Sequence, residues 1–217
     1  MINQNSQFQS KEEYKLPVFY KFPFHLFKNE TWNVEHINSN TTNGLEKDIE
    51  QKEWLKYSLL KEDLTDDIKN KIKVFLNNAD EKPSFEELSN EIETADDGEW
   101  DNIDKNKIWN FVLLDEGTNK GYGNAIFPAK RRCIIGKDQG KKYTISDALE
   151  VSEEKGTIAF VPPVTKHVFL KYYNTSVDNL QKWTKTDAEA YKKNILETLE
   201  RFGVIESSNN QNGGNNE

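Results

Sequence analysis

A glutamate and a histidine are neighbours in the segment WNVEHI, residues 32–37. The segment predicts a short strand, in which adjacent side chains point to opposite sides, so Glu35 and His36 can serve different partners. A carboxylate binds hard cations, and an imidazole that is neutral near pH 7 takes up a proton. The pair alone is a weak signal, because a single histidine is more often a surface or structural residue. The other two histidines, His25 and His167, lie in apolar aromatic runs, and we expect both to be structural.

Asparagine and glycine are frequent in a second segment, NFVLLDEGTNKGYGN, residues 110–124. Its candidates for polar contacts are Asn110, Asn119 and Asn124. The glycine spacing fits neither a Walker phosphate-binding loop nor a dinucleotide-binding fingerprint. Asparagine and glycine are also what an ordinary tight turn needs, so a functional loop and a plain turn both stay open here.

Positive charge is concentrated around and beyond that segment. Residues 117–137 contain five lysines and arginines and no acidic residue, whereas residues 78–104 contain eleven acidic residues and one lysine. The whole chain has 37 acidic and 29 basic residues and a net charge of −8, which argues against a general nucleic-acid coat. Only the basic stretch is suited to phosphate, and an ordinary solvated helix face is the alternative.

Length and composition set the class of protein. A chain of 217 residues forms one domain, or one domain with an appendage. It has no run of about 18 apolar residues for a membrane span, and residues 1–14 are too polar for a signal-peptide core. We therefore expect a cytoplasmic protein with no membrane association. Cys133 is the only cysteine, which excludes a disulfide framework and a cysteine-based zinc site.

Hydrophobic periodicity predicts the elements that position these residues. Before residue 115 we expect extended chain over residues 16–27, a strand over 32–37, and helices over 49–60 and 64–76. A third helix follows, with Ser84 as its N-cap and Glu87 three residues later. A strand over 108–114 is expected to be buried on both faces. From residue 115 onward we expect a turn over 115–124 and a helix over 122–135, whose basic residues lie opposite its apolar ones and which Pro128 kinks or begins. A polar connection with little strand over 137–162 and a helix over 183–202 that ends at Gly203 are expected next.

Taken in order, a strand with Glu-His, a strand that begins at an asparagine, an asparagine turn and a basic helix resemble the ββα-metal finger of HNH, or His-Me finger, nucleases. Within that superfamily the chain is most similar to the C-terminal nuclease domain of GmrSD-type restriction endonucleases. There a W-x-(I/V)-E-H-I segment is followed, after a helical insertion, by N-x-V-L-L-D-x-x-T-N-x-x-Y-x-N-x-x-F-x-x-K-R. Residues 32–37 and 110–131 match these motifs, the second at more than ten typed positions, and the likeness extends roughly over residues 16–203.

The resemblance implies an α+β fold, a mostly helical domain built around a ββα-metal (His-Me) finger. The domain would span residues 15–204, with the helical insertion at about 46–104, a flexible N-terminus over 1–14 and a disordered tail over 205–217. The resemblance also assigns roles: His36 as general base, Glu35 and Asn119 as ligands of one Mg²⁺ or Mn²⁺, and Asn110 as the residue that fixes the turn or orients the base. The residues expected to contact the DNA backbone are Lys120, Asn124, Lys130, Arg131 and Arg132.

The implied function is a metal-dependent DNA endonuclease that hydrolyses phosphodiester bonds in restriction or anti-phage defence. The proline or glutamine often found after Glu-His-Ile in such enzymes is replaced here by Asn38, Ser39 and Asn40. Nothing in the chain resembles the nucleotide-hydrolysing module of GmrSD-type enzymes, so we expect such a module, or a target-recognition module, in the same longer protein or in a partner subunit. The alternative is a non-catalytic module that binds nucleic acid or protein and retains the finger as scaffold.

Overall fold

The part of the chain that the computed structural model describes consists of helices and two small antiparallel sheets of two strands each. That part consists of residues 24–29, 31–39, 45–77, 83–93, 106–122, 124–158, 160–174 and 180–205, without the side chains of Leu26, Asn119 and Lys120. The expected mixture of helix and strand is therefore confirmed. None of the helices in these ranges is both long and apolar enough to cross a membrane.

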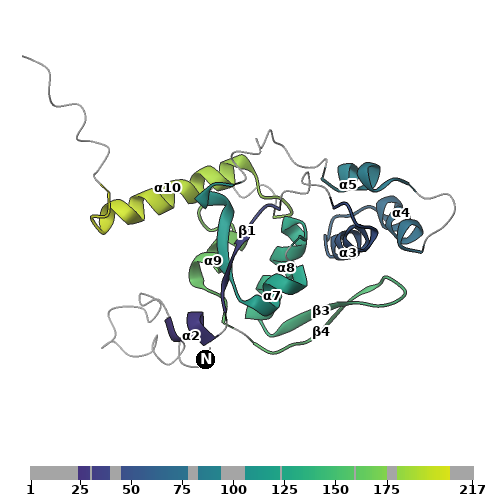
Figure 1. Ribbon diagram of the computed structural model, residues 1–217, viewed down its shortest axis with the longest axis horizontal. Helices are drawn as coiled ribbons and strands as arrows, with labels where there is room; N and C mark the ends of the chain where they lie inside the picture. The colour runs from purple at the N-terminus through teal and green to yellow at the C-terminus, as the bar shows by residue number, and fades with distance from the viewer. Residues whose placement is uncertain are drawn as a thin grey trace, which may run out of the picture.

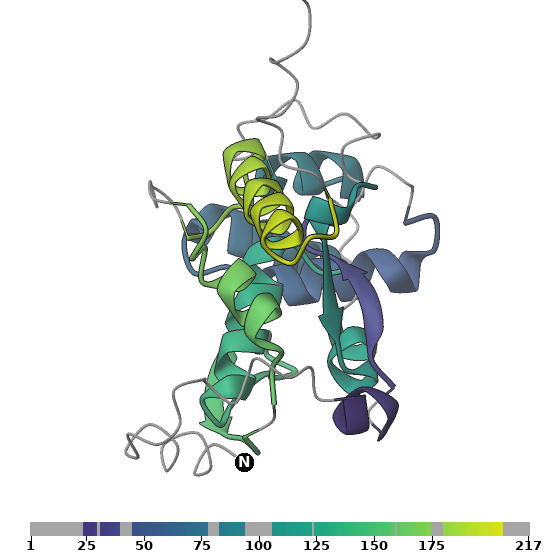
Figure 2. The same ribbon diagram turned by 90° about the vertical axis from the view of Figure 1, so that its left-hand side faces the viewer.

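The first sheet pairs two strands that are far apart in the sequence. Strand β1 (Asn33–His36) runs antiparallel to β2 (Phe111–Leu114), with Glu35 opposite Val112 and His36 opposite Phe111. Figure 2 shows the two strands side by side. The prediction of a strand at residues 32–37 is confirmed. The second predicted strand starts later than expected, at residue 111, and alternates between half-buried and buried residues rather than being buried on both faces.

The residues before β2 form a 3₁₀ turn, η2 (Ile108–Asn110). The Asn110 N–H donates to the carbonyl of Lys107 at 2.8 Å, which closes this turn and removes the residues before it from the ladder. Ile108 is 61% exposed, so its apolar character does not reflect burial in a strand.

Three helices lie in the described part of the interval between β1 and β2, as predicted. They are α3 (Asp48–Ser58), α4 (Asp66–Leu76) and α5 (Phe85–Glu93). The expected cap of α5 is present, since the Glu87 N–H donates to Ser84 Oγ at 3.1 Å and the Ser84 N–H donates to Glu87 Oε2 at 2.9 Å. Trp54, Leu60 and Ile72 from this interval are buried in the first of two hydrophobic clusters.

Two helices follow β2. The predicted turn at residues 115–124 is instead mostly helical, because α7 (Glu116–Tyr122) begins directly after Asp115. That carboxylate accepts from the N–H and the hydroxyl of Thr118, at 3.0 and 2.5 Å, and so caps the helix in a sequence whose glycines favour a turn. The next helix, α8 (Phe127–Asp138), starts later than predicted, with Pro128 in its first turn, where a missing N–H costs no hydrogen bond.

Helix α8 lies between the two hydrophobic clusters. Its Ala129 and Cys133 belong to the cluster formed with α3, α4 and α5, whereas its Phe127 and Ile134 belong to the cluster formed with β1 and β2. Figure 1 shows the same division, with α3, α4 and α5 on one side of α8, and β1, α9 (Pro163–Phe169) and α10 (Lys185–Arg201) on the other.

The second sheet is a correction to the sequence prediction. Strands β3 (Lys141–Ile145) and β4 (Val151–Lys155) form a hairpin where a polar connection with little strand was expected. Polar pairs stabilise it, including the hydroxyls of Thr144 and Ser152 at 2.8 Å and the Lys141–Glu153 ion pair at 3.0 Å. Because much of the hairpin surface is exposed, its residues do not show the apolar alternation by which a half-buried strand is recognised.

The two ends of the chain agree with the prediction only in part. The predicted C-terminal helix is confirmed as α10, and Gly203 after it has a φ of 67°, which suits glycine. Helix α2 (Phe24–Asn29) replaces the end of the predicted extended segment. Residues 16–23 of that segment, the N-terminus over 1–14 and the tail after residue 205 lie outside the described residues.

A buried ion pair fixes the start of α10. Lys171 and Asp187 are 2.8 Å apart, and their side chains are 3% and 1% exposed. Asp187 also accepts from the N–H and the hydroxyl of Thr184, each at 2.8 Å, and from the amide of Asn174 at 2.7 Å. Removing one partner of such a pair leaves the other charge buried and uncompensated.

We predict that Asp187→Asn lowers the free energy of unfolding by about 3–5 kcal/mol, because Lys171 stays buried without its counter-ion. Urea denaturation followed by circular dichroism measures this change. The matched control is Glu197→Gln, which breaks the exposed pair with Lys193 at 3.8 Å and is expected to cost less than about 1 kcal/mol. Equal effects of the two substitutions would contradict the prediction.

Candidate functional site

Strand β1 directs Glu35 and His36 to opposite faces of the first sheet, as the alternation of a strand requires. Glu35 faces α8, where its Oε1 lies 3.0 Å from Lys130 Nζ. His36 lies on the other face, with its ring centroid 4.6 Å from that of Phe111. Its Nε2 is 3.1 Å from Oδ1 of Asn106.

Lys130 is completely buried and joins α8 to the end of β1. Its ammonium donates to Glu35 Oε1 at 3.0 Å, to the carbonyl oxygen of His36 at 2.7 Å and to Ser39 Oγ at 2.7 Å. Burial lowers the pKa of Lys130, and the charge of Glu35 partly offsets that effect. We expected Lys130 to contact DNA phosphate, with an ordinary solvated helix face as the alternative, but the buried ammonium fits neither arrangement. Its ammonium points into the protein, where it cannot contact DNA.

Asn110 is also completely buried and fixes the loop that follows His36. Its Oδ1 accepts from the Asn38 N–H at 2.9 Å, and its Nδ2 donates to the Asn38 carbonyl at 3.0 Å. Its own carbonyl accepts from the Ile37 N–H at 2.8 Å. This arrangement matches a residue that fixes the turn rather than one that binds metal.

The other two basic residues of α8 that were expected to contact DNA are half-buried and have partners within the protein. Arg131 donates from Nε to the carbonyl of Phe169 at 3.0 Å. Arg132 donates from Nη1 to the carbonyl of Leu60 at 3.2 Å, and its guanidinium lies 4.5 Å from the centre of the Tyr143 ring. The basic residues predicted to form one DNA-binding row therefore diverge toward separate partners.

Three further predicted site residues lie before α8. Asn124 is exposed. Asn119 and Lys120 lie in α7 by their backbone, but their side chains are outside the described residues. The second predicted metal ligand and one predicted phosphate contact therefore have no described geometry.

An ion pair that the sequence reasoning missed anchors α7 to α8. Both carboxylate oxygens of Asp115 lie 2.9 Å from Lys137 Nζ, and the same ammonium donates to Thr118 Oγ1 at 2.6 Å. Burial favours the neutral form of Asp115, but the hydrogen bonds from Lys137 and Thr118 outweigh it, so the pKa of Asp115 lies below its usual value. The D-x-x-T spacing typical of a helix cap was the signal that could have identified half of this network.

A divalent cation would find few ligands in the described part of the protein. No group of three or more histidine, cysteine, aspartate or glutamate side chains gathers there. Glu35 is 15% exposed and offers a carboxylate, the kind of ligand that Mg²⁺ prefers, but one of its oxygens already accepts from Lys130. Glu35 thus fits a cation only together with ligands from elsewhere, such as Asn119 or a bound phosphate.

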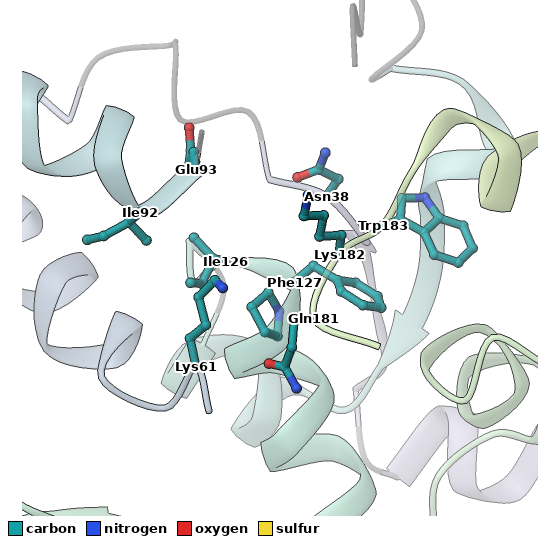
Figure 3. Close-up of a pocket in the computed structure, with 10 residues that line it drawn as sticks. Asn38, Lys61, Ile92, Glu93, Ile126, Phe127, Gln181, Lys182 and Trp183 are labelled. Carbon is teal, nitrogen blue, oxygen red and sulfur yellow. The ribbon is translucent and has the colours of Figure 1, made fainter. Parts of the chain in front are cut away.

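A pocket adjoins the loop that Asn110 fixes (Figure 3). It encloses about 390 Å³ of empty space, including the part that is open to solvent. Its lining residues come from the loop after β1, the segment after α3, the end of α5, the start of α8 and the segment before α10: Asn38, Lys61, Ile92, Glu93, Ile126, Phe127, Pro128, Gln181, Lys182 and Trp183. Half of these residues are apolar, and the polar half includes two lysines and one glutamate.

Comparison of the chain with known protein families, curated proteins and solved structures found no match. A function for this protein must therefore be argued from its own residues and their geometry.

We predict that Asp115→Asn is less stable than the parent at pH 7, by roughly 1–3 kcal/mol, because it loses a charge-assisted interaction with Lys137. Since the folded state lowers the pKa of Asp115, the carboxylate stabilises the fold above its ordinary pKa of about 4, and this stabilisation is lost as the pH falls through the lowered pKa. The difference between the two proteins should shrink in acid. Urea denaturation from pH 7 to pH 3 measures it, with exposed Asp147→Asn as control.

Proposed function

We propose that this protein is a metal-dependent DNA endonuclease that hydrolyses phosphodiester bonds in restriction or anti-phage defence. The observation that carries the proposal is the end of β1, where a histidine and a carboxylate stand next to a loop held by two fully buried polar residues, Asn110 and Lys130. Burial of polar side chains costs free energy unless each is hydrogen-bonded. Such a cost is expected where side chains must be held in a reactive geometry. The antiparallel pair β1–β2 with the helices after it would be the ββα finger.

His36 is proposed as the general base that activates water. In the proposed mechanism the imidazole carries its proton on Nε2, which lies 3.1 Å from Oδ1 of Asn106, an oxygen that can only accept. Nδ1 is then left as the acceptor for a proton from water. Packing against the ring of Phe111 limits rotation of the imidazole, and the Lys130 bond to the His36 carbonyl fixes its backbone.

Glu35 is proposed to hold one Mg²⁺ or Mn²⁺ together with Asn119. When bound, the cation would neutralise charge on the phosphate and on the leaving oxygen. Lys130 would act as a positioning residue in this scheme, because it fixes the carboxylate of Glu35 on the α8 side of the sheet. Lys130 supports the site from within, and we propose that residues such as Asn124 and Lys120 contact the DNA backbone.

A partner is part of the proposal. The chain has a net charge of −8, and Lys130, Arg131 and Arg132 of its basic helix form hydrogen bonds to other residues of the same chain. Such a protein is poorly equipped to attract DNA by charge alone. We propose that a nucleotide-hydrolysing or target-recognition module, in the same longer protein or in a partner subunit, brings the DNA to it.

One observation favours a second candidate, a non-catalytic module that binds nucleic acid or protein. The charge of Glu35 is already compensated by Lys130, and the described residues contain no group of three metal-ligating acidic, histidine or cysteine side chains. A finger kept only as scaffold would show the same buried Glu35–Lys130 and Asn110–Asn38 contacts.

Nicking of a supercoiled plasmid with Mg²⁺ and with a chelator separates the two candidates. We predict that the parent nicks only with Mg²⁺ and that His36→Ala lowers the rate by roughly 100- to 10,000-fold without loss of the fold. The matched control is His167→Ala, which removes a ring that stacks on Tyr172 with the centroids 4.7 Å apart. This substitution is expected to leave the rate unchanged. Equal nicking by His36→Ala would exclude His36 as the base, and an inactive parent would favour the non-catalytic module.

A further inference from the structure

The ammonium of Lys130 cannot move away from Glu35. Each of its three N–H groups has an acceptor, namely Glu35 Oε1, the His36 carbonyl and Ser39 Oγ, at 3.0, 2.7 and 2.7 Å. The Lys130 side chain is 1% exposed, so no solvent is within reach to replace these acceptors. A fixed positive charge therefore lies within hydrogen-bond distance of the carboxylate that is proposed to bind a cation.

This fixed charge opposes a second cation on the same carboxylate. The pair formed by Glu35 and Lys130 has no net charge, and a divalent ion on the other oxygen of Glu35 would lie only a few ångströms from the ammonium. Repulsion between charges at such separations is strong, and it is poorly screened when one of them is buried. The protein without DNA thus offers the ion a carboxylate whose charge is already compensated.

A phosphate of the nucleic acid would remove this obstacle. A phosphodiester carries a negative charge, and its oxygens are ligands that Mg²⁺ and Mn²⁺ prefer. An ion shared between Glu35 and the phosphate would be surrounded by two negative groups and one ammonium, instead of by one group of each sign.

We propose that the cation and DNA bind to this protein cooperatively, and that the buried ammonium of Lys130 sets the strength of the coupling by keeping the Glu35 site weak until a phosphate arrives. This inference rests on the proposed nuclease function, which it deepens. Coupling between two ligands is reciprocal, so the factor by which DNA strengthens cation binding equals the factor by which the cation strengthens DNA binding. The hydrolytic site would then be complete only on its substrate.

The coupling is measured in the non-cleaving His36→Ala variant. Free Mn²⁺ is followed by electron paramagnetic resonance in titrations with and without a short duplex, and binding of Mn²⁺ to the duplex alone is subtracted. We expect the affinity of the protein for Mn²⁺ to rise at least tenfold with DNA. Fluorescence anisotropy of the labelled duplex should show the same factor when saturating Mn²⁺ is added.

The role of Lys130 is tested by Lys130→Met in the same background, since methionine keeps an unbranched side chain without the charge. The DNA-free protein should then bind Mn²⁺ at least tenfold more tightly, and the coupling factor should fall toward one. The matched control is Lys166→Met, which removes an ammonium that pairs with a carboxylate outside the proposed site, that of Asp138 at 3.2 Å. It should leave the coupling unchanged.

The possible outcomes separate the inference from the proposed function. If Mn²⁺ binds equally tightly with and without DNA while the parent still nicks plasmid, the cooperative inference is wrong and the nuclease function stands. If a folded Lys130→Met variant keeps the full coupling, Lys130 is not its source. Should that variant fail to fold, the size of the coupling factor in the His36→Ala protein decides, because a factor of at least ten supports the inference and a factor near one overturns it. A parent that neither nicks plasmid nor binds Mn²⁺ with DNA present overturns both proposals.

Discussion

The buried ammonium of Lys130 is the constraint on which the rest of the site depends. A charged group without water must have each of its donors satisfied, or the fold loses several kcal/mol. Here the acceptors come from the carboxylate of Glu35, the backbone of His36 and the hydroxyl of Ser39. Strand β1, the loop after it and helix α8 must therefore assemble together, because none of them alone can satisfy this charge.

Helix α8 can carry that charge because it is enclosed on two sides. Ala129 and Cys133 pack with the helices inserted between the paired strands, and Phe127 and Ile134 pack with the sheet and the C-terminal helices. A lysine between these two clusters cannot extend its ammonium to solvent. The Asp115–Lys137 pair at the other end of α8 follows the same principle, since it joins α7 to α8 through a carboxylate that also caps α7.

The same burial gives the candidate site its character. The loop after His36 is held from two directions, by the side chain of Asn110 and by Lys130, so the geometry of the imidazole and of Glu35 is fixed before any ligand binds. Preorganisation of this kind favours catalysis. The cost is a carboxylate with its charge already compensated, which in our proposal ties the binding of a cation to the arrival of a further negative group.

The sequence by itself determined those local elements that capping, periodicity or strand alternation marks within a few residues, but not the β3–β4 hairpin or α7. Ser84 with Glu87 indicated the start of α5, and alternation placed Glu35 and His36 on opposite faces. Only the tertiary structure decided that Lys130 is buried, since its partner Glu35 lies 95 residues away in the chain. The amphipathic pattern around Lys130 was misleading because a buried lysine and an exposed one have the same letter, and only packing on both sides of α8 distinguishes them.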